Sequence, residues 1–332
     1  MSEPIVSLKN LAVHFPISRP LFGAPTIVKA VDGVSLDIHA GQFYGLVGES
    51  GSGKTTLGRA ILEAVPIAGG AGSYTDDEVR YELTKMSKSQ LKDYRKRAQL
   101  IFQDPYAALS PRMTVRDIIA EPLEVMKLTR SRAETDERVR QIAERCRLNL
   151  EHLRRFPHAF SGGQRQRISI ARALVCEPRF LVADESVAAL DVSIQADILN
   201  LLKSLQNELG LTFLFISHDL SVVAHTCDTV SVMYLGTLVE TAPTRKLFTT
   251  PHHPYTRALL SAIPSLDPDD AGRAQRLSGE IPSPTNPPDG CRFHTRCPHA
   301  VSMCSQQTPE LETVAAGHNV ACHRWQELLP TA

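Results

Sequence analysis

The strongest constraint on the fold is a glycine-rich turn, residues 48–55, which joins the apolar run Phe43–Val47 to a segment with helical spacing of apolar residues. The turn fits the pattern G-x-x-x-x-G-K-[ST], in which glycines let backbone N–H groups approach phosphate oxygens. A strand that enters such a turn and a helix that leaves it place the phosphates at a helix N-terminus, which favours anions. The sequence therefore predicts a phosphate-binding loop.

Two side chains of this loop have specific expected roles. Lys54 places its charge against the β and γ phosphates, and Thr55 offers its hydroxyl to Mg²⁺. A chance turn rich in glycine and serine is the alternative, and the flanking strand and helix disfavour it. The predicted nucleotide contacts are Gly48, Glu49, Ser50, Gly51, Ser52, Gly53, Lys54, Thr55 and Thr56.

Two carboxylates follow a second apolar run, residues 180–183. We expect Asp184 to hold Mg²⁺ through water and Glu185 to polarise the attacking water. Alone, an Asp-Glu pair at a strand end is more often a solvated end. Beside a phosphate loop it indicates phosphoryl-transfer chemistry.

The remaining pattern predicts an α/β domain. Strands are expected in residues 5–15 and 28–38, and strands then alternate with helices up to residue 216, which is typical of a mainly parallel sheet. Residues 115–160 are charged and have apolar residues at helical spacing, which predicts an inserted helical lobe. Residues 69–98 are Gly-rich and then highly charged, so we expect an exposed connection there.

A Ser-Gly-Gly-Gln run at residues 161–164 precedes a helix of small and basic residues. It is either an ordinary helix cap or an anion site at a helix start. The run resembles the signature motif of ABC ATPases, which contacts the γ-phosphate of ATP held by the opposite subunit. The residues that the resemblance assigns to this contact are Ser161, Gly162, Gly163 and Gln164.

The resemblance covers residues 5–245 and implies further roles. Gln103 matches the glutamine that senses Mg²⁺ and contacts the membrane partner, and His218 matches the switch histidine that bonds the γ-phosphate. Asp191 matches the D-loop aspartate. Phe15 stands near the place of the aromatic that stacks on adenine, although a strand phenylalanine is more often core. Ala188 departs from the family, which usually has serine there.

The family's fold is a P-loop NTPase (RecA-like) core with an antiparallel β subdomain and an inserted helical subdomain. Placed on this chain, it implies an ATPase domain at 1–248 with the helical subdomain at about 106–165. In the family, two such domains sandwich two ATP molecules, and each phosphate loop is closed by the other domain's signature motif. Residues 249–332 would form a mostly irregular extension, because prolines accumulate after residue 250.

Two motifs in this extension narrow the family. Residues 253–264 and 290–298 resemble the C-terminal segments of oligopeptide/dipeptide permease ATPases, and residues 102–112 look more like the second of the two paired ATPases.

The extension also holds four cysteines with C-x₅-C-x₆-C-x₁₇-C spacing: Cys291, Cys297, Cys304 and Cys322. Four thiolates suit zinc or an iron–sulfur cluster. Resembling proteins carry a 4Fe–4S cluster here, so we expect this cluster, with zinc or unmetallated thiols as alternatives.

Function and partners follow from this resemblance. The chain would energise import of di- or oligopeptides, with nickel, glutathione and opines left open as cargo. It would pair with a paralogous ATPase as a heterodimer on two transmembrane permease subunits, served by an extracytoplasmic binding protein. The alternative is a non-transport ABC ATPase of translation or DNA repair, whose chains usually have two cassettes or a long coiled coil.

Composition agrees with that interpretation. The 36 basic and 36 acidic residues give a formal charge of zero, so no net charge attracts nucleic acid and no nucleic-acid partner is expected. No run reaches the roughly 20 apolar residues that span a bilayer, and the first residues do not resemble a secretory signal. We therefore expect a soluble protein, held peripherally at the cytoplasmic face of the inner or plasma membrane.

Overall fold

The computed structural model describes residues 3–18, 26–188, 190–263 and 279–328. Contacts group the chain into two compact units. Unit 1 comprises Met1–Val6, Ile38–Gln42 and Ser73–Ile216, and unit 2 comprises Ser7–Asp37, Phe43–Gly72 and Ser217–Ala332.

Unit 1 is built on three parallel strands, β6 (Ala98–Ile101), β7 (Phe180–Asp184) and β8 (Thr212–Ile216). All residues of β7 and β8 are buried, as expected when helical crossovers cover both faces of a parallel sheet. The register pairs Asp184 with Ile216 at the ends of β7 and β8. This edge of the sheet therefore presents whatever follows each strand.

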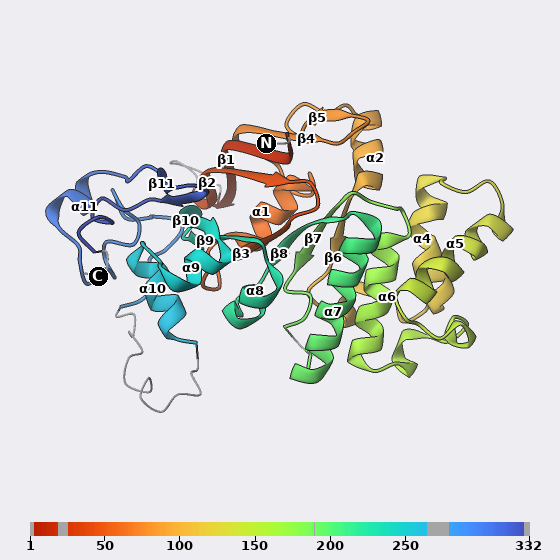
Figure 1. Cartoon of the computed structure of the whole chain (residues 1–332). Helices are drawn as coiled ribbons and strands as arrows, with labels where there is room; N and C mark the ends of the chain where they lie inside the picture. Colours follow the sequence, from red (N-terminus) through yellow and green to blue (C-terminus); the bar gives the residue numbers. More distant parts are fainter. Residues whose placement is uncertain (1–2, 19–25, 189, 264–278, 329–332) are drawn as a thin grey trace. The chain divides into compact units, whose positions relative to one another are not determined.

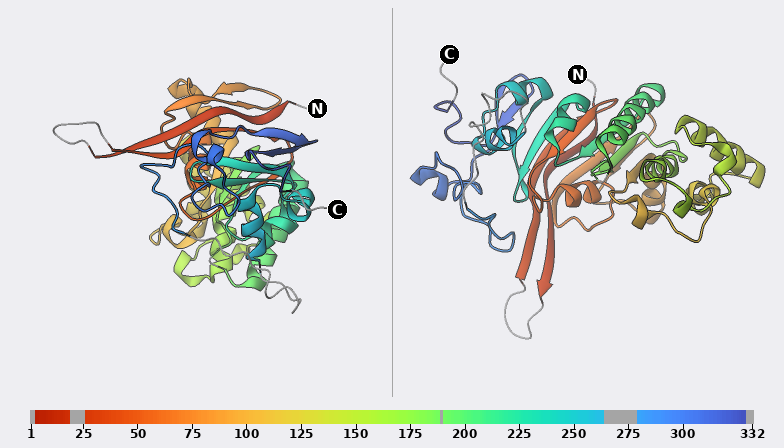
Figure 2. Two further views of the ribbon diagram at one scale, coloured as in Figure 1. Left: turned by 90° about the vertical axis from the view of Figure 1, so that its left-hand side faces the viewer. Right: turned by 90° about the horizontal axis from the view of Figure 1, so that it is seen from below.

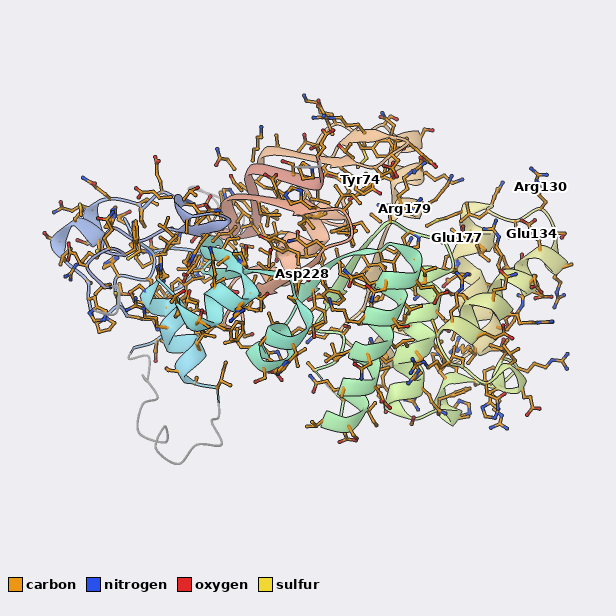
Figure 3. The ribbon with its side chains drawn as sticks, in the orientation of Figure 1. Tyr74, Arg130, Glu134, Glu177, Arg179 and Asp228 are labelled. Carbon is orange, nitrogen blue, oxygen red and sulfur yellow. The ribbon has the colours of Figure 1, made fainter. Side chains whose placement is uncertain are left out.

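Helices of unit 1 confirm the predicted helical stretch and divide it (Figure 1). Lys127 ends α4 in a left-handed conformation, and Ser131 caps α5. At the intervening turn, labelled in Figure 3, the Glu134 carboxylate accepts a hydrogen bond of 2.7 Å from the Arg130 N–H. The helices and short 3₁₀ turns are α3 (Pro105–Ala108), α4 (Val115–Met126), α5 (Arg132–Arg145), η1 (Leu150–His152), η2 (Pro157–Ala159), α6 (Gly162–Leu174) and α7 (Val192–Leu209).

The expectation of an exposed connection over residues 69–98 is wrong. This segment forms β4 (Gly69–Thr75), β5 (Arg80–Glu82) and α2 (Lys88–Arg97). Its core is three buried tyrosines, Tyr74, Tyr81 and Tyr94, with ring centroids 5.2 to 6.4 Å apart. Aromatic side chains bury large areas, so three of them order a segment whose many charges suggested a loop.

Unit 2 contains the strand that leads into the glycine-rich turn. This strand, β3 (Phe43–Val47), pairs in parallel with β9 (Thr229–Tyr234), which forms an antiparallel hairpin with β10 (Thr237–Pro243). Two longer strands, β1 (Pro4–Ser18) and β2 (Thr26–His39), run side by side as a ribbon (Figure 2). The helices of unit 2 are α1 (Lys54–Ile61), α8 (Leu220–Thr226), α9 (Thr244–Thr249), α10 (Pro254–Ser261) and α11 (Ser302–Gln306).

Within the described residues no helix is long and apolar enough to cross a membrane.

Residues after 250 are integrated into the sheet of unit 2. The strand β12 (His318–Val320) pairs with β10 and with β11 (Glu312–Ala315). Glu240, the β10 residue that pairs with Val320, is fully buried and accepts hydrogen bonds from the N–H groups of His252 and His253 at 2.7 and 3.0 Å. The His318 imidazole lies 2.8 Å from the same carboxylate. A buried carboxylate is tolerated because it is fully bonded.

The buried His253 makes the stability of this region depend on pH. Its Nδ1 accepts a hydrogen bond from the Tyr255 N–H at 3.1 Å, capping α10, and burial lowers its pKa from 6.5 to about 4. Below pH 6.5 the unfolded chain binds a proton that the folded chain refuses, so stability falls as pH falls towards 4. We expect this loss to be on the order of 3 kcal/mol.

The variant His253→Asn keeps an oxygen cap and does not titrate. Denaturant unfolding at neutral pH and at pH about 5 should show a smaller pH dependence for this variant than for the wild type. If the free energy of unfolding changes equally with pH in the variant and in the wild type, the role assigned to His253 is wrong.

Candidate functional site

In the glycine-rich turn of unit 2, neighbouring backbone leaves no room for a side chain at Gly48 or Gly53. Gly48 and Gly53 have φ of 150° and 105°. A Cβ added to either would lie 2.1 Å from a carbonyl oxygen, that of Met233 or of Ala30. The glycines are therefore required by close packing as well as by conformation.

The side chains of this turn are held for ligand binding. Lys54 is 5% exposed, and its Nζ donates hydrogen bonds to the carbonyl oxygens of Gly48 at 2.8 Å and Glu49 at 3.0 Å. The buried Ser52 Oγ has no hydrogen-bond partner among the residues that the structure describes. A cradle of close backbone, a buried cation and an unbonded hydroxyl fits a phosphate group.

Tyr255 and Arg296, both from the region after residue 250, also reach this turn at Glu49. The sequence motifs included both residues but gave no sign that they approach the turn.

The carboxylates of unit 1 lie where β7 ends. Asp184 is 3% exposed. Glu185 follows it with a left-handed φ of 44°, and its N–H donates to the Ile216 oxygen at 2.9 Å. The Gln103 Nε2 donates to the Glu185 Oε2 at 2.7 Å. The structure therefore brings together two side chains that lie 82 positions apart in the sequence, and the amide fixes the orientation of the carboxylate.

The Ser-Gly-Gly-Gln run forms a capping box at the start of α6. The Ser161 Oγ accepts from the Gln164 N–H at 3.4 Å, and the Gln164 Oε1 accepts from the Ser161 N–H at 3.1 Å. A Cβ on Gly163 would lie 2.5 Å from the Ile194 side chain, so glycine lets α6 approach α7. The local structure is thus that of a tightly packed helix N-terminus.

The other predicted residues occupy the expected elements. His218 is exposed directly after β8, and Asp219 behind it caps α8. Asp191 is the N-cap residue of α7 and makes no side-chain cap bond. Phe15 is partly exposed on β1. Their roles, like those of the loop and signature residues, stay predictions.

A groove that the sequence analysis missed lies in unit 1 between β6, α4 and α6, with a volume of about 290 Å³. Two of its apolar residues are exposed, Phe102 at 42% and Val125 at 69%. The lining residues are Gln99, Leu100, Phe102, Glu121, Pro122, Val125, Met126, Ser169, Arg172 and Ala173. We call this the Phe102 groove.

The four clustered cysteines line one small pocket of unit 2, together with His253 and Phe293. Cys304 is buried and the other three are partly exposed. Burial raises the pKa of the Cys291 and Cys322 thiols to about 11. Over the ranges that the structure describes, no three His, Cys, Asp or Glu side chains are gathered closely enough to hold a metal ion. The four cysteines therefore share one pocket without forming a single-ion site among the described residues.

Comparisons with known proteins agree with these features. Residues 31–188 match the family model described as ABC transporter, and residues 239–304 match that of the oligopeptide/dipeptide transporter C-terminal region. Over 321 residues the chain is 50% identical to a Brucella ovis protein named for peptide import and ATP binding, covering 97% of this chain and 98% of that one. The di/tripeptide transport ATP-binding protein DppF of Pseudomonas aeruginosa is 45% identical, covering 98% and 99%.

A solved structure of similar fold is the ATP-binding cassette MJ0796, in a dimeric post-hydrolysis state bound to ADP and Pi. It is 27% identical, with a TM-score of 0.62, and the match covers 72% of this chain and 99% of that one. The predicted ABC ATPase fold is thereby confirmed, and the predicted C-terminal extension is not tested by this match.

Close packing at Gly53 gives a prediction about stability. Gly53→Ala combines a left-handed backbone with a clash against the Ala30 oxygen, and we expect a loss of about 3 kcal/mol or more in the free energy of unfolding. The matched control is Gly51→Ala, because Gly51 has φ of 78° and nothing within 4 Å of an added Cβ. Strain alone should cost it about 1 kcal/mol. Similar losses in denaturant titrations would argue against the close approach.

Proposed function

Since the chain belongs to the ABC transporter family and is one of its ATPases, we propose that it energises an importer of di- or oligopeptides. The observation that carries the proposal is the combination in one chain of an ATPase region and the oligopeptide-type C-terminal region. The names of the relatives at 45–50% identity, which refer to peptide transport, support the same cargo.

ATP hydrolysis would use the residues described above. Lys54 would neutralise phosphate charge, and Thr55 and, through water, Asp184 would hold Mg²⁺. Glu185 accepts the proton of the attacking water, and Gln103 keeps that carboxylate oriented through its 2.7 Å hydrogen bond. His218 would bond the γ-phosphate. When bound, Mg²⁺ supplies charge neutralisation on the transferred group.

The working unit would be a dimer with a paralogous ATPase. In it, the signature run of each subunit would contact the ATP held by the other. Two ATP molecules would then favour the closed pair, and hydrolysis would release it. A difference in affinity between two states is what lets a ligand drive a conformational change.

Membrane attachment would come from partner subunits. We propose that the Phe102 groove receives a cytoplasmic helical segment of a permease subunit, because exposed apolar residues line it next to the Gln103 segment. Apolar grooves are a common site for binding amphipathic helices. The chain would thus sit peripherally on the cytoplasmic face, and an extracytoplasmic binding protein would deliver the cargo.

The test of catalysis is Glu185→Gln, with Glu137→Gln on the exposed face of α5 as control. We expect the Glu185 variant to bind ATP and to form a stable ATP-dependent dimer with the paralogous ATPase, while its ATP turnover falls by at least about 100-fold. In cells lacking the native gene, it should fail to restore uptake of a labelled tripeptide that the control restores. Hydrolysis at the wild-type rate by the Glu185 variant would show that the base is wrongly assigned. If the wild-type chain restores no tripeptide uptake in these cells, the proposed peptide cargo is wrong.

We propose that Cys291, Cys297, Cys304 and Cys322 hold a 4Fe–4S cluster, with zinc as the alternative. Support comes from the four thiols lining one pocket. A cluster spreads its ligands over several irons, so it does not need the tight group that a single ion requires. Bound there, it would cross-link distant parts of the region after residue 250.

Anaerobically purified protein should show visible absorption, with iron and acid-labile sulfide in equal amounts. The variant Cys291→Ser should lose both, whereas Cys227→Ser outside the pocket should not. Stoichiometric zinc without iron would contradict the cluster.

A further inference from the structure

The phosphate loop is bonded by two side chains from the region after residue 250. The Arg296 guanidinium forms a bidentate pair with the Glu49 carboxylate, at 2.7 and 3.1 Å. The Tyr255 Oη accepts a hydrogen bond from the Glu49 N–H at 2.8 Å. All three residues belong to unit 2, and Tyr255 and Arg296 are almost completely buried.

Glu49 is also bonded from inside the loop. Its carbonyl oxygen accepts hydrogen bonds from the Lys54 Nζ at 3.0 Å and from the Ser52 N–H at 3.2 Å. The N–H, the carbonyl and the carboxylate of this one residue are therefore all engaged. Because Lys54 is bonded to Glu49, the position of Glu49 bears directly on the position of the lysine ammonium.

Neither contact is a loose surface interaction. The Tyr255 ring packs against Tyr234 and Phe293, with centroids 4.7 and 5.3 Å away. The Arg296 guanidinium lies over the Tyr234 ring, 5.8 Å from its centroid. Arg296 is 6% exposed, and a buried charge is tolerated only when it is paired. Bidentate arginine–carboxylate pairs also fix geometry as well as charge.

We propose that Tyr255 and Arg296 are positioning residues of the nucleotide site, which set the phosphate loop through Glu49. The region after residue 250 would then contribute to the nucleotide site by holding the phosphate loop in position. Each side chain is bonded to Glu49, through which it would act. This inference rests on nucleotide binding by the loop, which is part of the proposed function.

The experiment measures the affinity of the full-length chain for MgADP by titration calorimetry, since ADP needs the phosphate loop but no second subunit's contact to a γ-phosphate. Arg296→Gln breaks the charged pair, and we expect the Kd to rise about tenfold. Tyr255→Phe removes one hydroxyl and leaves the aromatic packing, and we expect a rise of about threefold or more. This second variant keeps the test valid if the arginine variant does not fold.

The control is His318→Gln. His318 also joins the C-terminal region to the rest of unit 2, but it does so through a hydrogen bond to Glu240, which is not part of the phosphate loop. We expect this variant to lose thermal stability while its Kd for MgADP stays within about twofold of the wild type. In the double variant Glu49→Gln/Arg296→Gln, the loss of affinity should be clearly smaller than the sum of the two single losses, because one interaction is removed twice.

Two outcomes would overturn the inference, in distinguishable ways. If Tyr255→Phe and Arg296→Gln fold and bind MgADP as the wild type does, the two residues only attach the C-terminal region, and the proposed function stands. If the wild-type chain itself binds no MgADP, the proposed function and this inference fall together.

Discussion

Backbone packing around the phosphate loop is the constraint on which the rest of unit 2 depends. The loop follows β3, and β3 pairs in parallel with β9, whose last residues bring the Met233 carbonyl against Gly48. The Gly236 N–H, in the turn after β9, donates to the Ser52 oxygen at 2.8 Å. With so little space, only glycine fits at the crowded positions. The loop is therefore shaped by neighbouring strands before any nucleotide arrives, which reduces the ordering cost of binding.

Two acidic residues, the buried Glu240 and the partly exposed Glu49, connect the C-terminal region to this arrangement. Glu240 on β10 is bonded by His252, His253 and His318, and Glu49 in the loop is bonded by Tyr255 and Arg296. All five of these partner residues lie after residue 250. Removing one partner would leave a buried charge uncompensated, which is strongly destabilising. The region is thus tied to the ATPase at its interior.

The same segment also forms the cysteine pocket. Pro254 and Cys297 line that pocket and are the chain neighbours of Tyr255 and Arg296, while Phe293 both lines it and packs on Tyr255. In unit 1 the arrangement is similar, because Gln103, which bonds Glu185, directly follows Phe102 of the apolar groove. Each unit therefore places a groove or pocket next to a residue for which we propose a role at the nucleotide site.

The sequence by itself determined the ATPase family, the buried parallel strands and the order of motifs, because a glycine pattern between a strand and a helix and apolar runs in alternation are local signals. It failed at residues 69–98, where Tyr74, Tyr81 and Tyr94 form a core that their charged neighbours hide. Only the tertiary structure decided that Gln103 bonds Glu185 and that Arg296 bonds Glu49. Those pairs join residues 82 and 247 positions apart, and no local pattern encodes a contact that depends on how distant segments pack.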